Sequence, residues 1–192
     1  MGLMVSLDLT GRHVLVVGGG RIAYRKTVKL IENGAQVTVI APAVLEAFQG
    51  LDCTVQRRAY RQGDETGFFM VLCATDDTAL NRQIYEDCDR AGILCMSVSN
   101  PSHCSMSATA GAGGISVSVS TAGQDPGFAR HLCKRFIGEI DGEMLGHFTA
   151  HVKLRKAVMD NAVRTQDKQG LLRRALAMSV EEIEGIVERG HE

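Results

Sequence analysis

Three consecutive glycines, at positions 18 to 20, follow the short β-rich run at residues 12–17. With the three residues after them they match the G-x-G-x-x-A pattern of dinucleotide sites. The matching residues are Gly18, Gly19, Gly20, Arg21, Ile22 and Ala23. The first glycine permits a tight turn, the third lets the backbone approach a pyrophosphate, and the small alanine allows close packing of helix on strand. The N–H groups and positive dipole end of the following helix would then face the phosphates. The pattern predicts dinucleotide binding, and the alternative is a turn that only joins two elements.

The second strand of this unit, Gln36–Ile40, ends in Ala41-Pro42-Ala43 rather than in an acidic residue. An Asp or Glu at this place usually binds the ribose of NAD, and an Arg accommodates the 2′-phosphate of NADP. Because neither residue type is present, NAD is only slightly favoured over NADP.

Two pairs of charged side chains are further candidates. Asp76 and Asp77 could act as paired carboxylates in acid–base chemistry, or one of them could cap the helix that follows. Arg25 and Lys26, in the first predicted helix, could reach a phosphate or a substrate carboxylate, or could form a solvated face.

Three histidines are further candidates. His103, next to Cys104, could handle a proton or touch a metal, or could be an exposed loop histidine. His147 and His151 are one helical turn apart, a spacing that can bind a metal. Since no third ligand is apparent, we expect no metal site and interpret this pair as surface or interface histidines.

Alternating strands and helices must position these groups. The first helix stops at Asn33-Gly34, and further strands are predicted near 54–57, 68–74, 93–98 and 115–120. Helices are predicted at 78–91, closed by Gly92, and from Asp125-Pro126 to residue 137. Such alternation implies an α/β fold of the Rossmann type, a parallel sheet covered on both faces.

The chain changes character near residue 140. Residues 144–159 and 169–187 contain no strand-like run and no proline, which predicts two or three amphipathic helices. This tail is too short for us to expect a core of its own. Its apolar stripe should therefore pack on the first domain or on a second subunit.

The composition is that of an ordinary globular protein, with 192 residues, 45% hydrophobic residues and a net charge of −1. A nearly neutral chain gives no electrostatic argument for binding nucleic acid or an anionic membrane. No apolar stretch reaches the roughly 18 residues that a membrane span needs, and residues 1–9 lack the features of a signal peptide. The six cysteines show no CxxC pair or zinc-ligand spacing, so we expect free thiols and a cytoplasmic protein.

Longer motifs resemble the N-terminal domain family of siroheme synthases, which are precorrin-2 dehydrogenases and in some cases also sirohydrochlorin ferrochelatases. The resemblance covers residues 5 to 140 and rests on VLVVGGGRIAYRK at 14–26, GAQVTVIAP at 34–42, CATDD at 73–77, Leu80-Asn81 and STAGQDPGFAR at 120–130. It implies an NAD-binding Rossmann domain at 1–112, a dimerisation segment at 113–142 and a helical tail at 143–192. The implied activity is NAD-dependent oxidation of precorrin-2 to sirohydrochlorin in siroheme biosynthesis, by a homodimer and with ferrochelatase activity left open.

The resemblance also implies where the ligands lie. By position, Arg21 and Ile22 of the glycine turn and the segment Ala41, Pro42 and Ala43 would contact the adenosine side of the cofactor. Ala74, Thr75 and Asp76 would line the cleft at the carboxyl end of a strand, where open α/β sheets bind ligands. Residues assigned to the tetrapyrrole substrate are Asn81, Ser120, Thr121 and Gly123. For the last three the alternative is a simple strand-to-helix turn.

The chain departs from the family where catalysis is expected. The family reads N-V-V-D after the strand near 93–96, and its aspartate is the candidate group for proton transfer and metal insertion. Here Ser99 stands at the place of the aspartate, and neither Ser99 nor Asn100 can act as a carboxylate base. The candidate catalytic residues are therefore Ser99, Asn100 and His103.

Two other functions stay open. One is a dinucleotide-binding protein of a tetrapyrrole pathway, a chelatase or nucleotide-sensing partner, that has lost dehydrogenase activity. The other is a structural or regulatory homodimer whose glycine turn is vestigial.

Overall fold

The computed structural model describes residues 3–99 and 101–190. The chain forms two compact units, residues 1–106 and 107–192. The finer division into three segments remains a prediction. No helix among the described residues has the length and apolar character needed to cross a membrane.

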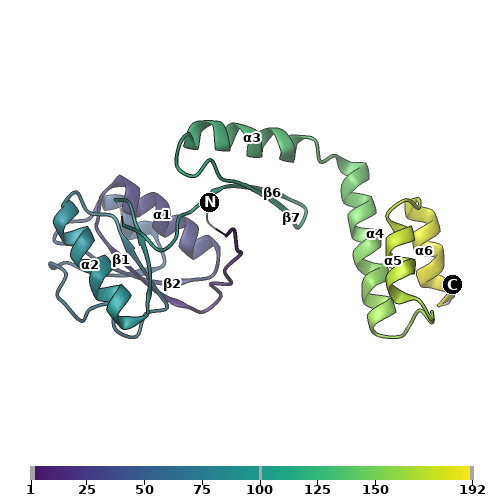
Figure 1. The fold of residues 1–192 in the computed structure, drawn as a ribbon, viewed down its shortest axis with the longest axis horizontal. Coiled ribbons are helices and arrows are strands. Elements are labelled where there is room, and N and C mark those ends of the chain that lie inside the picture. Colours follow the sequence, from purple (N-terminus) through teal and green to yellow (C-terminus); the bar gives the residue numbers. More distant parts are fainter. Residues whose placement is uncertain (1–2, 100, 191–192) are drawn as a thin grey trace. The chain divides into compact units, whose positions relative to one another are not determined.

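The first unit, in which Figure 1 labels β1, β2, α1 and α2, is built on a five-stranded parallel sheet. The strand order is β3-β2-β1-β4-β5. Its strands are β1 (His13–Val17), β2 (Gln36–Ile40), β3 (Cys53–Gln56), β4 (Met70–Cys73) and β5 (Leu94–Ser97). Its helices are α1 (Arg21–Glu32), the short 3-10 helix η1 (Glu46–Gly50) and α2 (Thr78–Ala91). The predicted α/β fold of the Rossmann type is confirmed.

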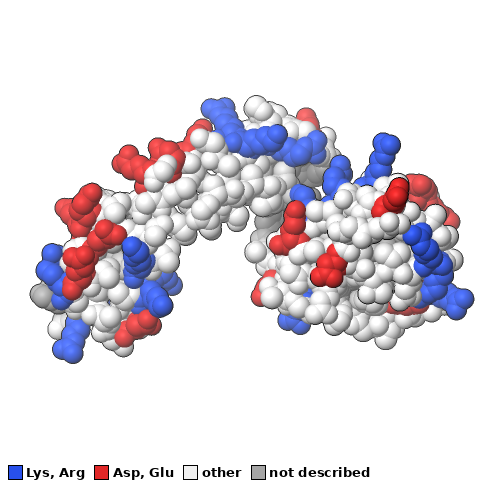
Figure 2. All heavy atoms as spheres, turned by 180° about the vertical axis from the view of Figure 1, so that it is seen from behind, with Lys and Arg blue, Asp and Glu red and all other residues white. Residues whose placement is uncertain are grey.

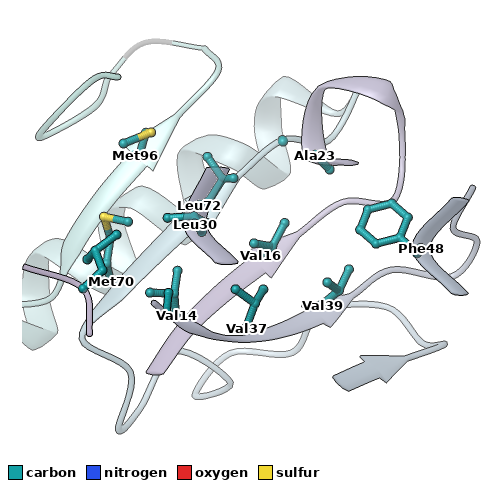
Figure 3. Close-up of a cluster of buried hydrophobic side chains, with 13 residues drawn as sticks. Val14, Val16, Ala23, Leu30, Val37, Val39, Phe48, Met70, Leu72 and Met96 are labelled. Carbon is teal, nitrogen blue, oxygen red and sulfur yellow. The ribbon is translucent and has the colours of Figure 1, made fainter. Parts of the chain in front are cut away.

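Helices cover both faces of the sheet, and the alternation of side chains along β1 decides which face each residue serves. Val14 and Val16 pack with Ala23 and Leu30 of α1, in the cluster drawn in Figure 3. Leu15 and Val17 point the other way and belong to a second cluster with α2. Since β1 and β4 are buried on both faces, their sequences are nearly continuous runs of apolar residues.

Three cysteines lie fully buried in the α2-side cluster: Cys73 on β4, Cys95 on β5 and Cys88 on α2. The sulfur atoms of Cys73 and Cys95 are 3.5 Å apart, and all the cysteines are free thiols.

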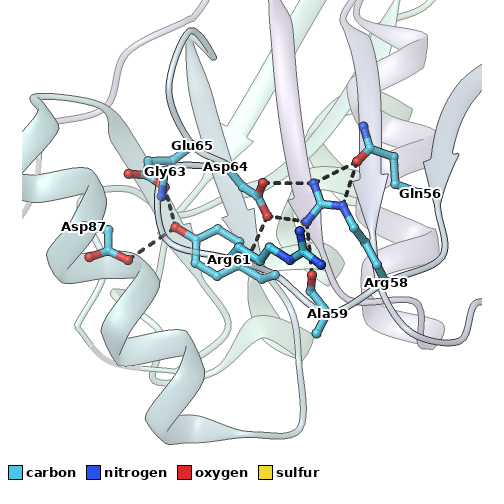
Figure 4. Close-up of polar contacts among 9 residues, drawn as sticks. Gln56, Arg58, Ala59, Arg61, Gly63, Asp64, Glu65 and Asp87 are labelled. Atoms are coloured by element: carbon cyan, nitrogen blue, oxygen red, sulfur yellow. Dashed lines mark hydrogen bonds and ion pairs between the residues drawn. The ribbon is translucent and has the colours of Figure 1, made fainter.

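The connection from β3 to β4 contains no helix and is held instead by side chains (Figure 4). The Arg58 guanidinium donates two hydrogen bonds to the Asp64 carboxylate, at 2.6 and 2.9 Å. The buried Tyr60 hydroxyl donates to Glu65 and lies 3.3 Å from an Asp87 oxygen. Burial and the Glu65 carboxylate raise the pKa of Tyr60, so the phenol stays a hydrogen-bond donor that ties the connection to α2.

The second unit begins with an antiparallel hairpin, β6 (Ala108–Ala112) and β7 (Ile115–Val119), followed by α3 (Pro126–Gly138). Cys133 of α3 is buried on the hairpin, with its sulfur 3.1 Å from the Ala108 carbonyl oxygen. The expectation that 115–120 belongs to the parallel sheet is wrong, because β7 pairs only with β6. The sequence did not predict β6, whose small residues have little strand propensity.

The C-terminal helices α4 (Gly142–Met159), α5 (Lys168–Ala175) and α6 (Val180–Arg189) have a core of their own. Leu154, Leu171 and Ile183, one from each helix, are fully buried in it. The expectation that the tail is too short to form a core is therefore wrong. Three short helices bury enough apolar surface because each contributes a stripe to a shared centre.

Candidate functional site

The glycine turn between β1 and α1 is constrained by the backbone around it. Gly18 has a φ of +126°, and a Cβ there would clash with the backbone of Ala74. A Cβ on Gly19 would clash with the Ala43 carbonyl. Position 20 differs, because a Cβ on Gly20 would meet no heavy atom within 4 Å. The protein's own packing requires the first two glycines, whereas the space beside Gly20 is open to an external group.

The N-terminus of α1 has no side-chain cap. Gly20 is the N-cap residue, and the first turn contains no acidic side chain. The other five α-helices of the described chain each begin with an Asp or Ser whose side chain accepts a backbone hydrogen bond. The first N–H groups of α1 and the positive end of its dipole therefore lie beside the open space at Gly20, which fits an anionic phosphate.

The segment after β2 lies against this turn. The Leu45 N–H donates to the Gly19 carbonyl oxygen at 3.0 Å. Ala41 is buried, whereas Pro42 and Ala43 are exposed. The predicted adenosine-side residues thus adjoin the turn, and two of them are accessible to a ligand.

A polar network joins the loops that follow β4 and β5. The Asn81 amide contacts Thr75 through three hydrogen bonds and Ser99 Oγ through a fourth, at 3.3 Å. Ser99 Oγ also lies 3.2 Å from Ser97 Oγ. The structure thus brings three of the predicted site residues together at the carboxyl end of the sheet. Asn100 lies outside the described residues.

The two aspartates after β4 have different environments. Asp77 is the N-cap of α2, and its carboxylate accepts hydrogen bonds from the Ala79 and Leu80 N–H groups at 2.9 and 3.0 Å. Asp76 is exposed. Of the two roles weighed for this pair, capping is the one that Asp77 performs.

His103 does not join the Ser99 network by any hydrogen bond among the described residues. Its Nδ1 accepts a hydrogen bond from the Cys95 N–H at 3.0 Å, and its Nε2 lies 3.0 Å from an Asp89 oxygen. The ring also packs on Tyr85, with centroids 4.6 Å apart. These contacts fix the imidazole between β5 and the last turn of α2, so a role for His103 in proton transfer remains only a prediction.

The basic pair in α1 splits between two environments. Arg25 is exposed, whereas Lys26 is partly buried with its Nζ 3.6 Å from the sulfur of Met96. Burial lowers the pKa of the Lys26 ammonium, and the charges of Arg25 and Lys29 lower it further. The sequence could have indicated this position, because Lys26 follows the buried Ala23 by three residues on the helix.

In the second unit, the predicted substrate residues form the turn from β7 to α3. The Ser120 hydroxyl accepts from the Ala122 N–H at 3.2 Å, and the Thr121 hydroxyl from the Asp125 N–H at 3.1 Å. Gly123 has a φ of +80°. These contacts build the turn, and substrate binding by these residues remains a prediction.

His151 contacts α5, and His147 contacts the loop between α5 and α6. Their Nε2 atoms lie 3.1 Å from the Met178 carbonyl oxygen and 2.9 Å from the Leu172 carbonyl oxygen. Both line a groove of about 550 Å³ together with Phe148. Among the described residues no group of three or more side chains is arranged to hold a metal ion.

Comparisons with known proteins place these features in context. Residues 5–110 match the family model described as "Putative NAD(P)-binding". The siroheme synthase of Nitrosococcus oceani is 30% identical over 202 residues, covering 97% of this chain and 43% of that protein. The siroheme synthase of Azotobacter vinelandii is 37% identical over 136 residues, covering 67% of this chain and 29% of that protein. The chain therefore spans less than half the length of these relatives.

A solved structure is similar over nearly the whole chain. It is that of SirC, a precorrin-2 dehydrogenase, with a TM-score of 0.78 and 26% sequence identity. The similarity covers 98% of this chain and 100% of that one.

Proposed function

This chain belongs to the NAD(P)-binding family of siroheme synthase N-terminal domains, and from that premise we propose that it oxidises precorrin-2 to sirohydrochlorin with NAD as the electron acceptor. The observation that carries the proposal is the uncapped N-terminus of α1 beside the open space at Gly20. An anion-binding turn of this kind is what a dinucleotide needs.

The chain's own residues would hold NAD through its phosphates and its adenosine. The N–H groups of Arg21 and Ile22, in the first turn of α1, would donate to the pyrophosphate. The exposed Pro42 and Ala43 would contact the adenosine side, and the loop at Thr75 would line the cleft towards the nicotinamide. When bound, NAD supplies the hydride acceptor.

The reaction also releases a proton, which the protein must accept or pass to water. Written in balance, precorrin-2 and NAD⁺ give sirohydrochlorin, NADH and one proton. Ser99 is held in place by Asn81 and Ser97, but a hydroxyl is a poor base near neutral pH. We therefore expect Ser99 to orient groups by hydrogen bonding, and proton release to be the slow part of the reaction.

A specific observation favours a second candidate, a dinucleotide-binding protein without dehydrogenase activity. The network around Ser99 consists of hydroxyl, amide and backbone groups from Thr75, Asn81 and Ser97, with no carboxylate or imidazole hydrogen-bonded to it among the described residues. A chelatase or nucleotide-sensing role would need the glycine turn but not a base at position 99.

We also propose that the protein is a homodimer joined through its second unit. Apolar side chains remain exposed on α3 and α4, including Phe128, Met144 and Val152. A second copy is the partner that the family resemblance implies, and it would cover this apolar surface.

Basic residues on α3 suit a substrate rich in carboxylates. Figure 2 shows Lys and Arg side chains gathered over α3, where Arg130, Lys134 and Arg135 are exposed. Guanidinium and ammonium groups are the usual partners of carboxylates. The free cysteines are consistent with a cytoplasmic location, which we propose with the same function.

Two measurements test the function. Calorimetric titration with NAD should give a measurable affinity, and an anaerobic assay with precorrin-2 should show NADH formation. NAD binding without NADH formation would favour the second candidate. The absence of NAD binding would overturn both.

A further inference from the structure

Asn81, near the start of α2, uses its whole side chain within the protein. It is buried, with 1% of its surface exposed. Its Oδ1 accepts from the Thr75 N–H at 3.3 Å and from the Thr75 hydroxyl at 2.8 Å. Its Nδ2 donates to the Thr75 carbonyl oxygen at 2.9 Å and to Ser99 Oγ at 3.3 Å. A carboxamide offers two donors and two acceptor lone pairs, so no capacity remains for a ligand.

One end of this set of contacts leads to the cofactor turn. Asn81 holds the N–H, carbonyl and hydroxyl groups of Thr75. The peptide between Ala74 and Thr75 in turn occupies the space where a Cβ on Gly18 would lie. A shift of this peptide would therefore press on the glycine turn or leave it unsupported.

The other end leads to the loop after β5. Ser99 Oγ receives the Asn81 Nδ2–H, and the Ser99 N–H donates to Ser97 Oγ at 3.2 Å. Within residues 3–99 and 101–190, Asn81 is thus the single side chain that hydrogen-bonds both to the loop beside the cofactor turn and to the residue at the expected catalytic position.

We propose that Asn81 is a positioning residue that fixes the loops after β4 and β5 relative to one another, and that it acts on the reaction through Thr75 and Ser99 rather than by touching substrate. The kinetic consequences of this inference rest on the proposed function. Whether Asn81 fixes the two loops can be measured by hydrogen exchange without any ligand.

The test is Asn81→Asp, which keeps the two acceptor contacts with Thr75 and removes the two donated hydrogen bonds. Gln83→Ala, at an exposed position of the same helix, is the matched control. We expect amide hydrogen exchange to become at least about tenfold faster in residues 74–76 and 97–99 of the variant, because these loops lose their shared anchor. Exchange in residues 83–91 should not change.

The kinetic readout separates positioning from a general loss of stability. In Asn81→Asp we expect the Kd for NAD to rise at least about fivefold and kcat to fall at least about tenfold, since both loops move. A purely structural role would lower the Tm and the active fraction but would leave the Kd and the kcat per active site unchanged. Unchanged exchange in a folded Asn81→Asp variant overturns the proposal.

Two further variants, each of which removes a contact of Asn81 with only one of the two loops, keep the test valid if Asn81→Asp does not fold. Thr75→Val removes the hydroxyl contact with Asn81 and the one that the same hydroxyl makes with the Asp77 carbonyl oxygen at 3.0 Å. Ser99→Ala removes the contact of Asn81 with the loop after β5. Faster exchange confined to the loop that lost its contact supports the proposal, and unchanged exchange in both overturns it. A wild-type protein that fails to bind NAD contradicts the proposed function alone, because the exchange experiment still decides whether Asn81 fixes the loops.

Discussion

The glycine turn after β1 and the Ser99 segment after β5 lie at the same edge of the sheet, yet they are built by different means. At the turn, the backbone of one segment packs directly against the backbone of another, so that Gly18 and Gly19 leave no room for a side chain. At Ser99, by contrast, hydroxyl and amide side chains hold the loop through hydrogen bonds.

This difference decides what each region tolerates. A backbone contact accepts no added atom, whereas a hydrogen-bonded network can exchange one polar side chain for another of similar size. A serine at the place of the family's aspartate is therefore compatible with the local structure. The cofactor turn keeps the family pattern, and the region expected to do chemistry departs from it.

The substitution Gly18→Ala should break the turn and give the largest effect. The new Cβ would clash with Ala74 in a backbone conformation that favours glycine, and we expect a loss of about 3 kcal/mol in the free energy of unfolding. Urea denaturation measures it. Gly63→Ala is the control, because position 63 also has a positive φ but open space for a Cβ. Equal losses in the two variants would show that the clash with Ala74 is not the cause.

The substitution Ser99→Asp tests the other side of the comparison. The new carboxylate could accept hydrogen bonds from Asn81 and Ser97 and serve as a proton acceptor. We expect NADH formation with precorrin-2 to become roughly a hundredfold faster, at the low end of the effect of a general base. His103→Ala tests the other candidate: slower NADH formation would support proton transfer by His103, and an unchanged rate would exclude it. If Ser99→Asp has no effect and the wild type is already fast, a carboxylate was never needed here.

Gly20→Val separates an effect on NAD binding from an effect on the packing of the protein. Because the Cβ meets no protein atom, the fold should survive. The side chain would still obstruct the pyrophosphate, and we expect NAD to bind at least tenfold more weakly, about 1.4 kcal/mol. Calorimetry on the folded variant measures the affinity, and an unchanged Kd would falsify the phosphate role of the turn.

The smallest effect is expected from a substitution in α1, the helix that follows the glycine turn. The Thr27 hydroxyl is buried without a hydrogen-bond partner among the described residues. Thr27→Val should stabilise the protein by about 1 kcal/mol, because an unsatisfied polar group is removed and the shape is kept. Thr149→Val, which removes a hydroxyl that donates to the Leu145 carbonyl oxygen at 2.8 Å, is the control. A stabilisation of the same size there would contradict this explanation.

The sequence predicted the elements that local rules determine. The strand, glycine turn and helix from β1 through α1 were predicted because the turn pattern and the apolar spacing agree. Asp77 caps the N-terminus of α2 and Gly92 its C-terminus, as the capping rules expect. Strand β6 was missed because alanine and glycine carry no strand signal, and its pairing depends on β7 and α3. The meeting of Thr75, Asn81 and Ser99 could not be read from the sequence either, because it depends on how two loops and a helix pack.

The buried sulfur atoms make the chain a reporter of its own unfolding. The thiolate, not the protonated thiol, is the nucleophile that attacks thiol reagents. The contact with Cys73, together with burial, raises the pKa of Cys95 to about 12, and contact with Cys95 and burial raise that of Cys88. These thiols therefore stay unreactive until the first unit opens. Within the second unit, burial alone keeps reagents away from Cys133. Timed alkylation followed by peptide mass spectrometry would record when each unit opens, in one sample and without an engineered probe.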